Sequence, residues 1–270
     1  MSKFFTTEIS DPFFESDNLR YITVKSKALN RRADITVYVP TDIGKEVSVD
    51  MVILLHGVYA SHWAWTRLAG VHKMADKLIE EGKIRPMVLV MPSDGLFGDG
   101  SGYLTHQNED YEKWIVEDVI QVVKEQIALV TDNSSVFIAG FSMGGYGALR
   151  LGAKYPTVFK TFSGLSSITE LNQLIPFLEG EDKNDLFKNA LPTETVFDCL
   201  LANKETLPLF RFDCGTEDSL LEFNQELHIK LTENNINHIY KEAAGEHEWD
   251  YWQNHIADIL LFFNEFDKNR

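Results

Sequence analysis

The chain has 270 residues, of which 44% are hydrophobic, and it carries a formal net charge of −16. This length suits one large α/β domain or two small ones, and the hydrophobic content is ordinary for a globular protein with a core. The charge argues against nucleic acid or an anionic membrane as the main partner, because phosphate binding requires clustered Lys and Arg. We interpret the charge first as a source of solubility and, as a weaker alternative, as a preference for neutral or cationic substrates.

The N-terminal residues 1–5 lack the long apolar stretch of a signal peptide. No run approaches the roughly 18 apolar residues of a membrane span. Cys199 and Cys214 are the only cysteines, so a disulfide framework is not indicated, and neither has metal-ligand spacing. We therefore expect a cytoplasmic protein without a bound metal or cofactor.

The first predicted element is an antiparallel hairpin. Residues 19–26 and 31–40 alternate apolar and other side chains, and the segment Leu29-Asn30-Arg31 separates the two runs. Buried strands are then predicted by continuous apolar runs at 51–55, 87–91, 136–139 and 209–212, with weaker candidates at 161–165 and 238–241.

Helical patterns alternate with these strands. Apolar residues recur three to four positions apart over residues 71–82, 111–130, 145–154, 220–234 and 250–266. This alternation predicts an α/β fold: a mostly parallel central sheet with helices on both faces, preceded by the N-terminal hairpin. In such a sheet the functional site lies beyond the carboxyl ends of the strands.

The segment 166–206 interrupts this rhythm with two prolines and a charged run. Two interpretations are equally favoured, a small helical insertion over the site and a peripheral surface excursion. Apart from this segment, the chain is expected to form a single domain over residues 1–270.

The most informative motif is the pentapeptide Gly140-Phe141-Ser142-Met143-Gly144. It fits the pattern G-x-S-x-G, directly follows an apolar β-branched run and precedes a helical pattern, which is the context of a nucleophile elbow. The two glycines relieve crowding around a serine held in a strained backbone conformation. We predict that Ser142 is a catalytic nucleophile.

A serine hydroxyl needs a histidine to take its proton and a carboxylate to orient that histidine. In α/β-hydrolases the chain order is Ser, acid, His, which disfavours the four histidines that precede Ser142: His56, His62, His72 and His106. Of the later ones, His228 and His255 fall in helical patterns and His238 opens a strand. His247 lies in a loop between the last strand and the last helix, so it is the predicted base.

The acid should follow the strand at 209–212, where Asp213, Glu217 and Asp218 are the candidates. Asp213 continues directly from the strand and is expected to pack or pair there. Asp218 lies several residues past the strand end and can reach the histidine loop, so it is favoured over Glu217.

An oxyanion requires two backbone N–H donors. Met143, the residue after the nucleophile, should supply one. The loop after the strand 51–55 should supply the other, and Val58 is the chosen donor because Gly57 permits close backbone approach. We expect His56 to support this loop through side-chain hydrogen bonds.

Aromatic residues accompany these loops. Trp63, Tyr103 and Trp252 could form an apolar wall for an acyl group or stack on a sugar, or they could simply cap the core. The expected substrate-binding residues are His56, Gly57, Trp63, Tyr103 and Trp252. The glycine-rich loop 93–102 lacks both the spacing of a calcium loop and the lysine of a phosphate loop, so it is interpreted as a flexible site loop.

Taken together, these motifs resemble the esterase D / putative esterase family, which includes S-formylglutathione hydrolases, tributyrin esterases, feruloyl and acetylxylan esterases, and the antigen 85 mycolyltransferases. The resemblance runs from about residue 20 to the end of the chain. It is carried by Leu54-Leu55-His56-Gly57, Val90-Met91-Pro92, Gly140-Phe141-Ser142-Met143-Gly144-Gly145-Tyr146-Gly147-Ala148, Cys214-Gly215-Thr216-Glu217-Asp218 and Gly245-Glu246-His247-Glu248-Trp249-Asp250-Tyr251-Trp252.

The resemblance implies the α/β-hydrolase fold, carboxylester hydrolysis, and the roles assigned above to Ser142, Asp218 and His247. Two departures separate the chain from subgroups of the family. The S-formylglutathione hydrolases usually have another oxyanion loop than His56-Gly57-Val58-Tyr59 and another cysteine pattern. The secreted polysaccharide esterases usually carry signal peptides.

The sequence therefore predicts a serine carboxylesterase that acts on small acyl esters through an acyl-enzyme intermediate. A thioesterase of the S-formylglutathione type, a feruloyl or acetyl-carbohydrate esterase, an acyltransferase and a non-catalytic binding module remain as alternatives. The expected partner is a small-molecule ester, and a homo-oligomer is compatible with the sequence.

Overall fold

A nine-stranded sheet runs through the computed structural model of the chain, which describes residues 2–44, 48–179 and 194–266. The strands lie in the order β1-β2-β3-β5-β4-β6-β7-β8-β9. Their bounds are β1 (Thr7–Ile9), β2 (Leu19–Lys25), β3 (Arg32–Tyr38), β4 (Asp50–Leu55), β5 (Met87–Pro92), β6 (Val136–Phe141), β7 (Phe159–Leu165), β8 (Phe210–Gly215) and β9 (His238–Ala243).

The N-terminal part of the sheet is antiparallel and the rest is parallel. β2 and β3 form the predicted hairpin, and β3 continues antiparallel onto β5. From β5 through β4, β6, β7, β8 and β9, every neighbouring pair is parallel. The carboxyl ends of these six strands therefore meet at one edge of the sheet, where a site is expected.

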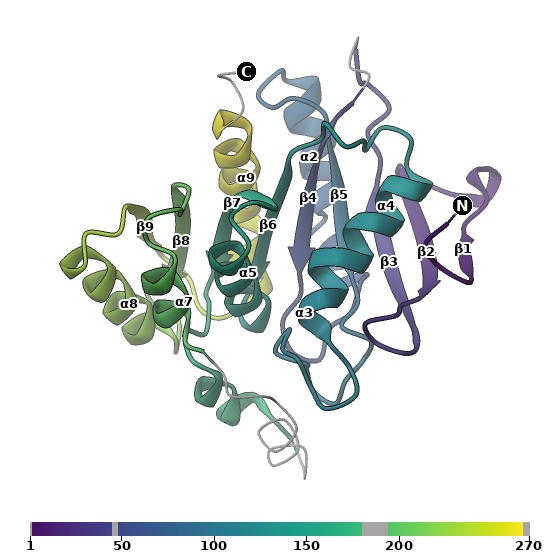
Figure 1. Cartoon of the computed structure of the whole chain (residues 1–270). Helices are drawn as coiled ribbons and strands as arrows, with labels where there is room; N and C mark the ends of the chain where they lie inside the picture. The colour runs from purple at the N-terminus through teal and green to yellow at the C-terminus, as the bar shows by residue number, and fades with distance from the viewer. Residues whose placement is uncertain (1, 45–47, 180–193, 267–270) are drawn as a thin grey trace.

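The helices cover both faces of the sheet (Figure 1). α2 and α9 pack on one face, whereas α4, α5, α7 and α8 pack on the other. The α-helical bounds are α1 (Ala64–Arg67), α2 (Val71–Glu80), α3 (Tyr111–Lys113), α4 (Ile120–Gln126), α5 (Met143–Lys154), α7 (Val196–Ala202), α8 (Leu221–Glu233) and α9 (Trp249–Phe266). The other helical turns are η1 (Pro12–Phe14), η2 (Trp114–Val119, a π-helix) and η3 (Leu171–Phe177).

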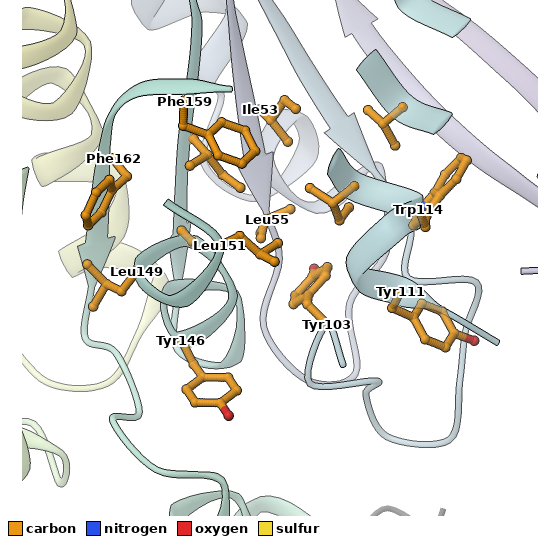
Figure 2. Close-up of a cluster of buried hydrophobic side chains, with 14 of the residues drawn as sticks. Ile53, Leu55, Tyr103, Tyr111, Trp114, Tyr146, Leu149, Leu151, Phe159 and Phe162 are labelled. Atoms are coloured by element: carbon orange, nitrogen blue, oxygen red, sulfur yellow. The ribbon is translucent and has the colours of Figure 1, made fainter. Parts of the chain in front are cut away.

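Two hydrophobic cores follow from the alternation of side chains along each buried strand. In β4, Met51, Ile53 and Leu55 enter the core under α4 and α5, whereas Val52 and Leu54 enter the core under α2 and α9. Figure 2 shows part of the first core, where Ile53 and Leu55 lie near aromatic side chains from several elements. Because both faces are buried, β4, β5 and β6 are apolar almost without interruption.

The predicted elements are confirmed with shifted ends. The strand predicted at 209–212 extends to Gly215, so Asp213 lies inside β8 rather than after it. The helix predicted over 111–130 begins at Tyr111, contains the π-helical turn η2 and ends at Gln126. Ile127 has an extended backbone; it and Val130 are buried in the following turn, which explains why the apolar spacing continued past the helix.

Several elements were not predicted, namely β1, η1 and α1. β1 is an edge strand of three residues, too short to show an alternating pattern. Within the segment 166–206, the structure contains η3 and α7, while residues 180–193 lie outside the described residues. No helix among the described residues has the length and apolar character needed to span a membrane.

Candidate active site

Ser142 stands at the junction between β6 and α5, with backbone angles φ 54° and ψ −121°. This left-handed conformation is costly for a residue with a side chain, and the surrounding contacts must hold it in place. The neighbouring glycines make the turn feasible. A Cβ on Gly140 would lie 2.3 Å from the Gly144 carbonyl oxygen, and one on Gly144 would lie 2.5 Å from the Leu55 carbonyl oxygen.

A line of hydrogen bonds connects Ser142, His247 and Asp218. The Ser142 Oγ lies 3.0 Å from His247 Nε2, and His247 Nδ1 lies 3.0 and 3.1 Å from the two carboxylate oxygens of Asp218. Asp218 follows β8 and His247 follows β9, and these strands are parallel neighbours. Their carboxyl ends therefore bring the two side chains to the same place as the elbow.

Asp218 is buried, with 5% of its surface exposed. Burial alone would raise the pKa of this carboxyl, but the hydrogen bond and charge of His247 and the backbone N–H of Leu220 outweigh it. The pKa of Asp218 consequently lies below its ordinary value. An ionised Asp218 can accept a hydrogen bond from His247 Nδ1–H, which leaves Nε2 free to accept a proton from Ser142.

The two other acidic candidates have different partners. Asp213 binds Arg211 at 2.8 Å and accepts a hydrogen bond from the Tyr251 hydroxyl at 3.0 Å. Burial raises the pKa of Asp213, although the charge of Arg211 opposes this. Glu217 accepts the Gly245 backbone N–H at 2.7 Å and thereby ties down the loop that carries His247.

All eight histidines are described, and only His247 hydrogen-bonds to Ser142. The loop histidine predicted from chain order is thus the one that meets the serine. Others have partners elsewhere: His62 lies 2.7 Å from the Thr36 hydroxyl, His228 and His238 lie 2.7 Å from each other, and His255 lies 3.9 Å from Asp258.

The two backbone amides expected to bind an oxyanion both lie at this edge. Met143 opens α5 directly after Ser142, so its N–H belongs to the unsatisfied first turn of a helix. Val58 lines the same cavity as Ser142. Within the described part of the chain, neither amide donates a hydrogen bond.

The loop after β4 is supported from behind by His56 and Tyr103, both of which are buried. The Tyr103 hydroxyl accepts the His56 N–H and donates to the His56 carbonyl, both at 3.0 Å. Neither side chain is among the described residues that line the cavity at Ser142. Their side chains fix the backbone of the loop, and the expected contact of His56 and Tyr103 with substrate stays a prediction.

A cavity of about 410 Å³ opens beside Ser142 and His247. Gly57, Trp63 and Trp252, three of the residues expected to bind substrate, line it. Most of the wall is aromatic or aliphatic, which suits the apolar part of a small ligand. The lining residues are Gly57, Val58, Tyr59, Ala60, Trp63, Leu68, Phe141, Ser142, Phe177, His247, Trp249 and Trp252.

Some of these wall residues were not predicted. Trp249 follows His247 closely in the string Glu246-His247-Glu248-Trp249, and this proximity could have identified it. Phe177 gave no such signal, because it lies in η3 within the irregular segment 166–206. Its ring centroid lies 5.3 Å from that of His247, so at least this part of the segment reaches the site.

A second cavity of about 340 Å³ also borders Phe177. It contains neither Ser142 nor His247, and its walls include Glu170, Gln173 and Glu226. The aromatic cavity is therefore the one bordered by the candidate catalytic residues Ser142 and His247. In the described part of the chain, no three His, Cys, Asp or Glu side chains are grouped closely enough to hold a metal ion.

Comparison with known proteins links this geometry to a family. Residues 26–263 match the sequence model of a family described as "Putative esterase". An acetyl esterase of Caldicellulosiruptor saccharolyticus is 26% identical over 277 residues, covering 90% of this chain and 97% of that protein.

Solved structures show the same architecture. A ferulic acid esterase superposes with a TM-score of 0.77 at 23% identity, covering 97% of this chain and 99% of that chain. An S-formylglutathione hydrolase of Staphylococcus aureus superposes with a TM-score of 0.76 at 18% identity, covering 95% and 98%. At these identities the similarity establishes the α/β-hydrolase fold.

Proposed function

The chain belongs to the putative esterase family of carboxylic ester hydrolases, and from this premise we propose that it is a serine carboxylesterase acting on small acyl esters. The observation that carries the proposal is the line of hydrogen bonds from Asp218 through His247 to Ser142, with distances of 3.0 to 3.1 Å. We also propose that the chain works as one α/β-hydrolase domain, since one sheet extends through its described residues.

The proposed reaction has two steps. His247 Nε2 takes the hydroxyl proton of Ser142 while Oγ attacks the ester carbonyl carbon, and Asp218 stabilises the imidazolium. The N–H groups of Met143 and Val58 stabilise the oxyanion. His247 then gives its proton to the leaving alcohol, and an acyl-enzyme ester forms on Ser142. Water, deprotonated by the same histidine, releases the acid and restores the serine.

A second candidate substrate class is favoured by the shape of the cavity. A volume of about 410 Å³ is far larger than an acetyl group needs, and the aromatic rings of Trp63, Trp249 and Trp252 offer surfaces for an aromatic acyl group. The similar acetyl esterase and ferulic acid esterase correspond to these two classes. Aromatic-acid esters are therefore the alternative to short aliphatic esters.

One experiment tests the mechanism and separates the substrate classes. Hydrolysis of p-nitrophenyl acetate, butyrate and octanoate and of a feruloyl ester would be measured for the native chain and for Ser142→Ala. We expect the substitution to lower kcat by about a million-fold, as in other triads. Near-normal esterase activity in purified Ser142→Ala would refute the proposed nucleophile.

The pattern of rates identifies the acyl group. Serine-dependent activity on acetate and butyrate alone would support the small-acyl assignment, whereas a feruloyl preference would favour the aromatic alternative. Comparing matched oxygen and thiol esters, and adding acceptor alcohols, would detect thioester hydrolysis or acyl transfer.

A further inference from the structure

Asp94 and His56 form a buried pair that the proposed reaction does not use. Each side chain is 2% exposed, and Asp94 Oδ1 lies 3.6 Å from His56 Nε2. His56 follows β4 and Asp94 lies just after β5, and these strands are parallel neighbours. The pair therefore sits directly behind the loop that carries Val58.

The ring of His56 fixes one peptide plane. Its Nε2 accepts the backbone N–H of Asp94 at 3.2 Å, which leaves the proton on Nδ1, and Nδ1–H donates to the Gly57 carbonyl oxygen at 2.7 Å. The Gly57 carbonyl and the Val58 N–H belong to the same planar trans peptide, so they point in opposite directions. Holding the carbonyl consequently determines where the Val58 N–H points.

The carboxylate of Asp94 shapes the loop that completes this support. It accepts the backbone N–H of Leu96 at 3.2 Å and of Ser101 at 2.9 Å. The closed loop presents the Asp99 carbonyl to the Tyr59 N–H at 2.9 Å. Tyr59 has a left-handed φ of 61°, a conformation that needs such external support.

The same loop also meets the other oxyanion donor. A Cβ on Gly100 would lie 2.4 Å from Met143 Sδ and 3.3 Å from Val58 Cγ1, so the Gly100 backbone packs against both side chains. Beyond it, Tyr103 holds the His56 backbone through its hydroxyl. Burial raises the pKa of Tyr103 well above its ordinary value, so the hydroxyl remains a donor.

We propose that Asp94 and His56 are positioning residues that aim the Val58 N–H at the oxyanion. The proposal rests on the proposed function, since it assigns these residues to the oxyanion hole of that reaction. They act through the backbone of Gly57 and Val58 and touch no reacting atom. Their loss should thus weaken the transition state more than substrate binding.

Asp94→Asn tests the proposal, because an amide nitrogen cannot accept a backbone N–H as the replaced carboxylate oxygen did. We expect kcat for p-nitrophenyl acetate to fall about ten- to a hundredfold, less than or comparable to deleting an oxyanion donor, with KM within about twofold. A trifluoromethyl ketone forms a tetrahedral adduct with serine, and its Ki should rise by the same factor. The matching methyl ketone, a ground-state analogue, should bind as before.

Asp118→Asn is the matched control. Asp118 is also buried and accepts two backbone N–H groups, those of Lys27 and Ala28 at 3.0 and 3.2 Å, but it ties a loop outside the site. The Asp118→Asn substitution should lower the unfolding temperature and leave kcat and the Ki of the trifluoromethyl ketone unchanged. If Asp94→Asn behaves in the same way, with kcat and Ki within twofold of the native chain, the positioning role is refuted.

A second variant covers the case in which Asp94→Asn does not fold. Tyr103→Phe removes only the hydroxyl that holds His56, and Tyr155→Phe, whose hydroxyl binds Glu112 at 2.6 Å, is its control. A fall in kcat in Tyr103→Phe but not in Tyr155→Phe supports the proposed positioning of the Val58 loop from behind. Equal kcat in Tyr103→Phe and Tyr155→Phe overturns it. Ser142→Ala in the same assays separates this failure from failure of the proposed function.

Discussion

Asp213 and Asp218 belong to one short segment but have opposite electrostatic environments. Asp213 points to Arg211 and Tyr251 inside the protein, and burial raises its pKa. The pKa of Asp218 is lowered because the contributions of His247 and the Leu220 N–H exceed the cost of burial. Of the two carboxylates, only Asp218 contacts the histidine.

Replacing each aspartate by asparagine should therefore have different effects on turnover. At position 218 the amide can stabilise the wrong tautomer of His247, so we expect kcat to fall about ten-thousandfold, as in other triads. Asp213→Asn should keep kcat within about tenfold, because an amide retains some of these hydrogen bonds and touches no reacting group. Steady-state kinetics of both variants near neutral pH would measure this.

Circular dichroism of both variants would control for misfolding. A larger loss of kcat in a folded Asp213→Asn than in Asp218→Asn would move the acid to Asp213 and contradict the proposed triad.

At the scale of elements, the junction between β6 and α5 depends on close contact with β4. A Cβ on Gly144 would lie 2.5 Å from the Leu55 carbonyl oxygen and 2.6 Å from that of His56. Both are backbone atoms, which cannot rotate away as a flexible side chain would. The glycine lets the first turn of α5 lie directly on the loop that carries Val58.

Gly144→Ala should consequently destabilise the protein. Inside a helix, alanine has a helix propensity about 1 kcal/mol more favourable than that of glycine. Any loss of stability must therefore come from the contact between the new Cβ and the carbonyl oxygens of Leu55 and His56. We expect a net loss of about 3 kcal/mol, the upper end for overpacking, together with a lower kcat as Met143 moves. Urea unfolding followed by tryptophan fluorescence would give the free energy of unfolding.

Gly70→Ala is the control for this substitution. Gly70 has a left-handed φ of 59°, and no atom lies within 4 Å of the position where a Cβ would be. The Gly70→Ala substitution should therefore lower the free energy of unfolding by about 1–2 kcal/mol through backbone strain alone. Stability of Gly144→Ala equal to or above that of the native chain would show that α5 can shift without penalty.

The central elements could be predicted because their local signals agree with their tertiary environment. Strands buried on both faces, such as β4 and β6, are apolar throughout, and the elbow has its own glycine pattern. The edge strand β1 and the short helix α1 were missed, since they are too short for a period to show. The length of β8 was underestimated because Asp213 is a buried charge whose partner Arg211 only folding reveals.

The candidate site, like the fold, could be predicted only where the sequence carries a local signal. Chain order and loop position sufficed to pair His247 with Ser142, and the structure brings them within 3.0 Å. The supporting role of His56 behind the cavity was predicted, but that of Tyr103 was not. Their hydrogen bonds join segments that only folding brings together. Phe177 reaches His247 through tertiary packing, for which the sequence carries no local sign.

At the scale of the whole molecule, the net charge of −16 gives the protein an overall negative field. The field is also local, because the exposed Glu246 and Glu248 flank His247. An anionic ester approaches this opening against repulsion, whereas a neutral ester does not. Repulsion between exposed charges is screened over about 10 Å at 0.1 M salt and over about 30 Å at 0.01 M.

Salt should therefore affect two matched substrates differently. We expect kcat/KM for anionic 4-acetoxybenzoate to rise several-fold between about 0.01 and 0.3 M NaCl, while that for its neutral methyl ester stays nearly constant. Attack at the acetyl carbonyl, which both esters share, forms the same acetyl-enzyme and releases a phenol from either substrate. Initial rates at low substrate concentration give the ratio of the two kcat/KM values directly.

The double variant Glu246→Gln, Glu248→Gln tests where this field originates. Because it removes two charges beside His247 without removing a hydrogen bond of the triad, it should raise kcat/KM for the anionic ester at low salt and flatten its salt dependence. An anionic ester whose kcat/KM is unaffected by salt would mean that the opening is not negative.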